Sequence, residues 1–464
     1  MLILKNMNKI PFTTLRLYSC KVKLNNVVII SATRTPMGSF LGGLSSLSAP
    51  KLGAIAIQAA IERASIPKDN VTEIYMGNVC QAFLGQAPAR QATLFAGFPK
   101  STVCTTVNKV CASGMKSIML ASQSLQCGHQ EIVLAGGMES MSNVPFYLPR
   151  GEIKYGGMKL EDGIVFDGLT DVYNKCHMGN CAENTAKKYN ITRDEQDKYA
   201  ISSYKRSAAA YANKNFQEEL VPVSVPQRKG NPDVIFNEDE EYKKVNFDKF
   251  EETVAEKMNL KPLARIIAFQ DAATDPIDFP IAPSFENTGF NKNDIALWEI
   301  NEAFSVVAIA NQKLLDLDPN KINVHGGAVS LGHPIGMSGA RLVVHLAHAL
   351  KAGEKGVASI CNGGGGASSI LIEKLCHTMS SPPILTLYTK YPCPLCDILK
   401  NELRLRFSGR YQLQEIDITA HGNERYLKLY KYEIPVLFLE RQFLCKHRLD
   451  SELLERKLQE FSQN

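Results

Sequence analysis

Residues 356–367 read GVASICNGGGGA, an apolar run that reaches a cysteine and then passes into four consecutive glycines. Such a run before a glycine-rich loop predicts a buried strand whose end faces a binding crevice. A second cysteine, Cys111, lies in the comparable loop NKVCASGMK at residues 108–116, directly before a small-residue stretch that predicts a helix. The chain therefore offers two thiols beside strand and helix ends, and we expect an α/β fold.

The order of predicted elements is similar in the two halves of the first 375 residues. The first half has predicted strands at 27–30, 74–77 and 131–135 and predicted helices at 54–61 and 113–125. In the second half, a helix near 338–341 precedes a strand at 356–360. Two similar βαβ halves that face each other would bring Cys111 and Cys361 to one crevice at the strand ends.

A third glycine-rich loop, HGGAVSLGHPIG at residues 325–336, carries His333 before Pro334. A neutral imidazole accepts a proton from a thiol, and glycines let a backbone approach a ligand closely. Two thiols and a histidine suffice for thioester chemistry in which one sulfur carries the acyl group and the second sulfur moves a proton. Because Cys111 follows Lys109 and precedes a helix, we expect its pKa to lie below the usual thiol value.

These loops resemble those of the thiolase family, and the resemblance covers residues 26–375. Further matching strings are GGMESMS at 136–142, HMG at 177–179 and NEAF at 301–304. The resemblance implies a thiolase fold with a first half at 26–144, a substrate-covering loop region at 145–262 and a second half at 263–375. For the acidic run at 237–241 within the loop region, a solvated surface is the alternative.

The resemblance also implies an activity, the reversible Claisen condensation of two acetyl-CoA molecules to acetoacetyl-CoA and coenzyme A. Cys111 would carry the acetyl group, His333 would be its base, and Cys361 would remove the methyl proton of the second substrate. Backbone N–H groups of Cys111 and Gly363 would hold the oxyanion. Asn301 would order a water that stabilises the enolate; a helix cap is the alternative for this asparagine.

The resemblance is to potassium-activated thiolases and implies further binding residues. Those for coenzyme A are Tyr204, Lys244, Val245, Asn246, Lys249, His177 and Met178. Tyr204 and the carbonyl of Val329 would contact K⁺. The same resemblance implies a homotetramer acting on acyl-CoA substrates, and a 3-ketoacyl-CoA thiolase of broader chain-length range remains an alternative.

The chain departs from the thiolase pattern after Phe250. A strand and a small-residue segment are expected there, but the sequence passes directly into residues 251–255, where we predict a helix. The absent segment would supply further K⁺ ligands, a serine near the pantetheine and a central strand, whose loss leaves ladder hydrogen bonds unmade. A shortened helix near residues 283–287 is a second gap. Our hypothesis is that both gaps are omitted exons, through either an incomplete reading of the gene or a splice form.

Residues 376–383 predict a linker, and residues 384–464 predict a second domain in the order βαβαββα. Cys393 and Cys396 form a Cys-x-x-Cys motif in which the first thiol attacks and the second resolves a mixed disulfide. Pro435 suits the cis-proline that faces such a site. This domain resembles glutaredoxin-like proteins of the thioredoxin fold, although a zinc half-site is the alternative.

Two accounts of the joined domains stay open: two neighbouring genes read as one, and a bifunctional protein. If the truncated thiolase part does not fold, the chain would act only as a thiol–disulfide oxidoreductase. Twelve cysteines scattered over 464 residues, with no secretory signal, favour a reducing compartment.

The net charge of +5 comes from the start of the chain, because residues 1–25 hold five basic residues and no acid. The other 47 of the 52 basic residues balance 47 acidic ones, so no electrostatic case for nucleic-acid binding arises. The basic, acid-free start predicts a mitochondrial transit peptide at 1–25 and a matrix location; a disordered start or a mis-assigned first exon is the alternative. The sequence has no uncharged apolar run of about 18 residues, so no membrane span is expected.

Overall fold

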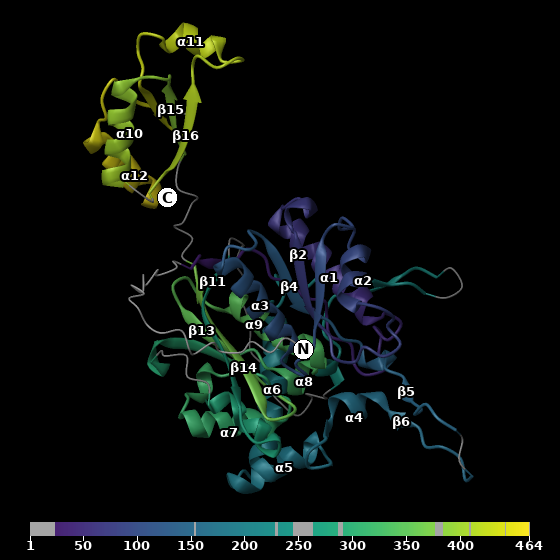
Figure 1. The fold of residues 1–464 in the computed structure, drawn as a ribbon. Coiled ribbons are helices and arrows are strands. Elements are labelled where there is room, and N and C mark those ends of the chain that lie inside the picture. Colours follow the sequence, from purple (N-terminus) through teal and green to yellow (C-terminus); the bar gives the residue numbers. More distant parts are fainter. Residues whose placement is uncertain are drawn as a thin grey trace, which may run out of the picture.

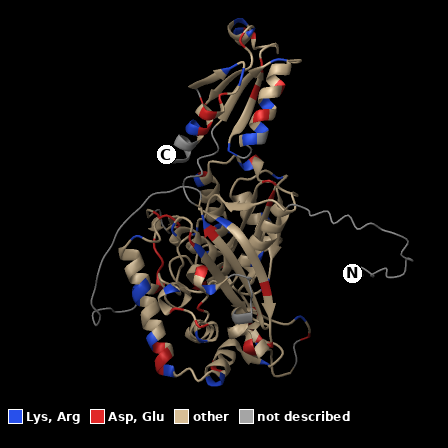
Figure 2. Ribbon diagram, turned by 90° about the vertical axis from the view of Figure 1, so that its left-hand side faces the viewer, with Lys and Arg blue, Asp and Glu red and all other residues tan. Residues whose placement is uncertain are grey.

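A computed structural model describes residues 24–152, 155–227, 231–244, 263–285, 291–375, 384–407, 410–440 and 442–463. Figure 1 shows a large α/β body, formed by the residues up to 375, and a small α/β unit that begins at residue 384. Basic and acidic residues are interspersed over both units (Figure 2). Within the described ranges, no helix has the length and apolar character needed to cross a membrane.

A three-stranded parallel sheet in the order β3-β2-β4 forms the centre of the first half. Its strands are β2 (Glu73–Gly77), β3 (Val103–Val107) and β4 (Val133–Gly137), and its helices are α1 (Ala49–Ala64), α2 (Pro88–Phe95) and α3 (Ser113–Gln126). Helix α1 buries Ala54, Ile57 and Ile61, which recur at helical spacing, against Ile74 and Met76 of β2. The helices and strands predicted in this half are all present.

A five-stranded sheet in the order β1-β11-β14-β13-β12 forms the second half. Its strands are β1 (Val27–Ile29), β11 (Ala264–Ala273), β12 (Ile295–Ile300), β13 (Lys355–Asn362) and β14 (Gly366–Lys374), with helices α7 (Ser305–Leu315), α8 (Ala328–Leu331) and α9 (Ile335–Ala349). We expected β1 to belong to the first half, but it pairs antiparallel with β11. The run that ends at Cys361 is the buried strand β13, as predicted.

Helices α3 and α9 pack directly against each other between the two sheets (Figure 1). Their contact depends on two glycines, Gly114 in α3 and Gly339 in α9. A Cβ on Gly114 would lie 2.9 Å from the backbone N of Ala340, and one on Gly339 would lie 2.8 Å from the N of Met115. Because backbone atoms cannot give way, only glycine permits this close approach of the two helices.

The outer edge of β4 has no partner strand among the described residues, since β1 belongs to the other sheet. A cavity of about 700 Å³ lies between β1 and β4, lined mainly by apolar side chains of α1, α3 and α9. Every residue of β4 is partly exposed, whereas a central parallel strand is normally buried. This geometry agrees with the predicted loss of a central strand after Phe250.

The region between the halves holds short strands and two longer helices. They are β5 (Phe146–Tyr147), β6 (Glu161–Asp162), α4 (Gly163–Gly168), β7 (Thr170–Asp171), β8 (Cys176–His177), α5 (Met178–Lys188), α6 (Arg193–Ala212), β9 (Val223–Val225) and β10 (Val234–Phe236). The 3-10 helices of the body are η1 (Lys68–Asn70), η2 (Met141–Asn143), η4 (Glu241–Lys244), η5 (Pro276–Phe285), η6 (Lys292–Asp294) and η7 (Pro319–Lys321). The helix predicted after Phe250 lies outside the described residues, as do residues 286–290 beside the second predicted gap.

The small unit has the predicted order βαβαββα. Its elements are β15 (Ile384–Thr389), α10 (Pro394–Phe407), β16 (Gln412–Asp417), α11 (Glu424–Tyr430), β17 (Val436–Leu439), β18 (Gln442–Lys446) and α12 (Ser451–Gln463). The sheet order is β16-β15-β17-β18, in which β15 and β16 are parallel and the other pairs antiparallel. Leu385, Leu387, Leu399 and Leu403 are fully or almost fully buried in its core.

Candidate active site

The loop that carries Cys111 is tightly folded between β3 and α3. Val110 has a φ of 47°, a left-handed conformation that is costly for a β-branched residue. The backbone N of Val110 donates to Asn108 Oδ1 (3.0 Å), and the hydroxyl of Ser113 donates to the carbonyl of Val110 (2.6 Å). These bonds hold the strained turn and fix Cys111 directly before the first turn of α3.

The prediction of a lowered pKa for Cys111 was wrong. Burial raises the pKa of this thiol to about 11, although the N–H groups of Gly363 and of Cys111 itself oppose the shift by hydrogen bonding to the sulfur. Lys109 does not act on the thiol as expected, because its ammonium group forms an ion pair with Asp271 and donates to the carbonyl of Ala367 (2.8 Å). Cys111 is therefore a neutral thiol at rest, between two backbone donors.

Cys361 and Asn301 lie at the same sheet edge, because Cys361 is near the end of β13 and Asn301 directly follows the adjacent parallel strand β12. Both side chains are completely buried, and the backbone N of Asn301 donates to the carbonyl of Ser359 (2.9 Å). The side-chain amide of Asn301 has no hydrogen-bond partner among the described residues. Since Phe304 is the N-cap of α7, Asn301 is not a helix cap. A buried amide of this kind is available to a water or a ligand.

His333 is oriented by Ser338, one turn into α9. Ser338 Oγ donates its single proton to the carbonyl of Pro334 (3.0 Å) and lies 2.6 Å from His333 Nδ1, so Nδ1–H donates to Ser338. His333 Nε2 then bears a lone pair, and this buried atom has no partner among the described residues. Burial lowers the pKa of His333 to about 4, with a smaller contribution from Arg341, so the ring is neutral near pH 7.

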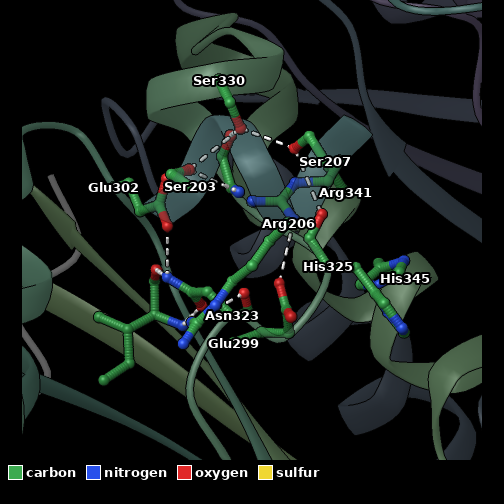
Figure 3. A network of polar contacts seen from close by, with 12 residues as sticks. Ser203, Arg206, Ser207, Glu299, Glu302, Asn323, His325, Ser330, Arg341 and His345 are labelled. Carbon is green, nitrogen blue, oxygen red and sulfur yellow. Dashed lines mark hydrogen bonds and ion pairs between the residues drawn. The ribbon is translucent and has the colours of Figure 1, made fainter. Parts of the chain in front are cut away.

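Glu302, the neighbour of Asn301, organises the surrounding loops. Figure 3 shows its carboxylate in a buried polar network between α6, α8 and the loop before α8. It accepts hydrogen bonds from Tyr199 (2.9 Å), Ser203 (2.7 Å), Asn323 (2.9 Å) and the backbone N of Val329 (3.0 Å). We assigned no role to Glu302, although an acidic residue between apolar strand and helix segments was a usable signal.

Glu139 is a second buried carboxylate without a role in the sequence interpretation. It accepts hydrogen bonds from the backbone N of Val79 (3.0 Å) and Gly336 (2.9 Å) and from Asn78 Nδ2 (2.7 Å). Burial raises the pKa of Glu139 to about 7, and these hydrogen bonds limit the rise. The carboxylate ties the loop after β2 to the start of α9, which follows His333.

The expected coenzyme A and K⁺ residues are only partly brought together. Helix α6, with Tyr204, packs against α8, with Val329, and against η4, with Lys244. Lys244 is exposed and pairs with Glu241 (3.0 Å). Val245, Asn246 and Lys249 lie outside the described residues.

His177 and Met178 lie where β8 passes into α5. His177 is exposed and caps α5, because its Nδ1 accepts a hydrogen bond from the backbone N of Gly179 (3.0 Å). Met178 is buried, and a Cβ built on Gly363 would lie 3.6 Å from its sulfur. Met178 therefore packs beside the loop that follows Cys361.

The small unit carries its two motif cysteines at the start of α10. Their sulfurs lie 2.8 Å apart, and both residues are buried. Burial and the neighbouring Cys393 raise the pKa of Cys396 to about 11. The Ile434–Pro435 peptide is cis, as predicted, and Ile434 packs with both cysteines.

Comparison with known proteins agrees with this architecture. Residues 27–256 match the family "Thiolase, N-terminal domain", residues 260–374 match "Thiolase, C-terminal domain", and residues 384–459 match "Glutaredoxin-like domain". The mitochondrial acetyl-CoA acetyltransferase of Rattus norvegicus is 61% identical over 78% of this chain and 94% of its own, and that of Homo sapiens is 60% identical over 78% and 93%. A crystal structure of the Acat5 thiolase from Ascaris suum with coenzyme A matches with a TM-score of 0.70 and 44% identity, covering 76% of this chain and all of that one.

The chain belongs to the thiolase family and is an acyltransferase by that membership. It also carries a C-terminal glutaredoxin-like domain. The match to the rat enzyme spans 398 residues, but 78% of 464 residues is only about 362. About 36 residues of the relative thus have no counterpart here, which agrees with the gaps predicted from the sequence.

Proposed function

We propose that this chain is an acetyl-CoA C-acetyltransferase, which condenses two acetyl-CoA molecules to acetoacetyl-CoA and coenzyme A. The observation that carries the proposal is the placement of the Cys111 sulfur between the N–H groups of Cys111 and Gly363. Those donors can stabilise negative charge that develops on a thioester oxygen bound there. The identity to mitochondrial acetyl-CoA acetyltransferases supports acetyl-CoA as the substrate.

In the first half-reaction, Cys111 attacks the carbonyl carbon of acetyl-CoA while His333 Nε2 takes the thiol proton. Because the thiol and the imidazole are both neutral at rest, proton transfer accompanies the attack. The C–S bond to coenzyme A breaks, and His333 returns the proton to the departing thiolate. An acetyl-Cys111 thioester and free coenzyme A result.

In the second half-reaction, Cys361 removes a methyl proton from a second acetyl-CoA. A water held by the buried amide of Asn301 stabilises the enolate oxygen. The carbanion then attacks the acetyl-Cys111 carbonyl, and the Cys111 sulfur leaves as a thiolate to give acetoacetyl-CoA. The proton that Cys361 removed passes to the Cys111 sulfur, which restores the Cys111 thiol and the Cys361 thiolate that began this half-reaction. Cys361 lies at the same sheet edge as Asn301, which supports proton removal by Cys361 and enolate stabilisation through Asn301 on the same substrate.

We assign coenzyme A binding to His177 and Met178 along the pantetheine arm and to Tyr204 and Lys244 near the nucleotide. Val245, Asn246 and Lys249 are assigned to the nucleotide end by sequence resemblance alone. Tyr204 and the Val329 carbonyl offer hard oxygen ligands of the kind that K⁺ takes. Two oxygens do not complete the coordination shell of K⁺, so we assign this ion no role in any step of the reaction. A location in the mitochondrial matrix fits the mitochondrial relatives, whereas the homotetramer is proposed from the sequence resemblance alone.

The test is peptide mapping by mass spectrometry after brief incubation with acetyl-CoA and an acid quench. Acetylation of Cys111, lost in His333→Ala, is the expected result. An unlabelled Cys111 in folded protein would contradict the proposal. Rates of thiolysis of acetoacetyl-CoA and of a long-chain 3-ketoacyl-CoA then separate this activity from that of a broader 3-ketoacyl-CoA thiolase.

We propose a second activity, thiol–disulfide exchange, for the glutaredoxin-like domain. The 2.8 Å approach of the Cys393 and Cys396 sulfurs at a helix start supports it. Cys393 would attack a mixed disulfide, and Cys396 would release the reduced product by forming the intramolecular disulfide. Reduction of a small mixed disulfide by the full chain tests this activity.

A further inference from the structure

A cluster of three potential metal ligands lies outside the catalytic loops, at the start of α5. The sulfurs of Cys176 and Cys181 are 3.7 Å apart. These two sulfur atoms and a carboxylate oxygen of Asp171 all lie within 4.8 Å of one another. Asp171 and Cys181 are buried, whereas Cys176 is partly exposed.

Local structure explains why the three side chains converge. Strands β7 and β8 form a short antiparallel hairpin in which Asp171 is directly opposite Cys176, so the two side chains share one face. Helix α5 follows β8 without a break, and Cys181 is the fourth residue of that helix. The hairpin and the first helical turn thus present their side chains to one another.

The carboxylate of Asp171 is already held in place. Its Oδ1 accepts a hydrogen bond from the backbone N of Tyr173 (2.9 Å), and its Oδ2 accepts one from the amide of Asn174 (2.5 Å). Within the part of the chain that the structure describes, no lysine, arginine or histidine forms an ion pair with Asp171. Outer hydrogen bonds of this kind commonly orient carboxylates that ligate metals.

The spacing of the sulfurs fits zinc. With Zn–S distances of about 2.3 Å, a tetrahedral site separates two thiolate ligands by about 3.8 Å. The observed 3.7 Å therefore requires almost no movement of the sulfurs. Two thiolates and one carboxylate are also a donor set that zinc accepts, and the exposed side of Cys176 leaves a fourth position for water.

The separation of the two sulfurs does not fit a disulfide. A disulfide would require the sulfurs of Cys176 and Cys181 to approach from 3.7 Å to about 2.05 Å. A divalent cation instead binds both sulfurs at their present separation and displaces the thiol protons as it binds.

We propose that Asp171, Cys176 and Cys181 bind one Zn²⁺ ion, releasing two protons from the thiols. The ion clamps the β7–β8 hairpin to the first turn of α5. That turn begins at Met178, and Met178, Cys181 and Cys361 belong to one buried apolar cluster. Zinc therefore stabilises the helix start that packs beside the loop following Cys361.

The test is zinc titration of the reduced, metal-free full chain in competition with a chromophoric chelator. All variants carry Cys393→Ser and Cys396→Ser, so that the glutaredoxin-like motif takes up no zinc. Cys181→Ser is expected to bind one equivalent less than its parent. Cys127→Ser, the same exchange at an exposed cysteine, is the matched control and is expected to lose none.

A second readout is independent of the catalytic cysteines. Zinc is expected to protect the partly exposed Cys176 from alkylation by iodoacetamide, and Asp171→Asn is expected to reduce that protection. Equal zinc uptake by Cys181→Ser and Cys127→Ser would overturn the proposal. So would a Cys176–Cys181 disulfide that forms at the same rate with and without saturating zinc.

Discussion

Ser338→Ala tests whether the tautomer of His333 controls acetylation of Cys111. The Ser338 hydroxyl gives its proton to the Pro334 carbonyl and accepts Nδ1–H of His333 at 2.6 Å, which leaves the Nε2 lone pair for the thiol proton. The substitution removes this acceptor and leaves a buried Nδ1–H unpaired, at a cost of about 1–3 kcal/mol. Without this acceptor nothing holds the proton of His333 on Nδ1, and a ring with its proton on Nε2 cannot act as the base. We therefore expect acetylation of Cys111 to slow by about 10–100-fold.

The assay is the rate of acetyl-Cys111 formation from saturating acetyl-CoA, followed by acid quench and mass spectrometry. Ser122→Ala is the matched control, because Ser122 is equally buried and donates to a carbonyl one turn earlier, Ile118, without contacting a histidine. This control is expected to acetylate at the rate of the unmodified chain. The reasoning fails if folded Ser338→Ala acetylates Cys111 as fast as the control does, or if only its KM changes.

Asn301→Ala is expected to slow the condensation step by about 100-fold, because the enolate oxygen loses one stabilising contact, much as an oxyanion that loses one donor does. Acetylation of Cys111 is expected to change little, and separate assays of the two half-reactions test both expectations. Glu139→Gln tests a pH effect: the pKa of Glu139 is about 7 when folded and lower when unfolded, so ionisation destabilises the fold as pH rises from about 4.5 to 7. Between pH 5 and 7.5 the Tm of the unmodified chain should fall relative to that of Glu139→Gln. If the two Tm values instead change in parallel with pH, the raised pKa of Glu139 is contradicted. Cys396→Ser should accumulate a mixed disulfide on Cys393 during turnover, whereas Cys393→Ser should reduce no substrate. Peptide mapping by mass spectrometry shows whether Cys393 carries the mixed disulfide, and an unmodified Cys393 in Cys396→Ser would contradict its role as the attacking thiol.

The helices and strands that were predicted correctly are those whose positions depend on short, local sequence patterns. The run ending at Cys361, the helix after Cys111 and the βαβαββα order of the small unit all follow from apolar periodicity and glycine positions. Strand β1 was also found at its predicted residues, but its sheet was not. A strand's partner depends on which edges elsewhere are open, and local sequence carries no such information.

The site was predicted in its motif residues and missed in its supporting ones. Glu139 accepts a hydrogen bond from Gly336, 197 residues further along the chain, and Ser203 contacts Glu302 from 99 residues away. Only the folded chain reveals such partners. The expected low pKa of Cys111 failed for a related reason, because burial outweighs the local helix terminus and Lys109 pairs with a residue from another strand.

The cavity beside β4 determines how activity of this chain should be interpreted. The apolar side chains that line this cavity of about 700 Å³ are partly open to solvent, so the fold lacks the stabilisation that their burial against a further strand would give. The catalytic loops do not rest on that edge: they precede α3 and α9, whose contact is made through Gly114 and Gly339, and they follow β12 and β13. The absent strand therefore lowers the fraction of folded chains more than it alters the chemistry of a folded one. Turnover per acetylated Cys111, rather than per mole of chain, is the quantity that reports on this active site.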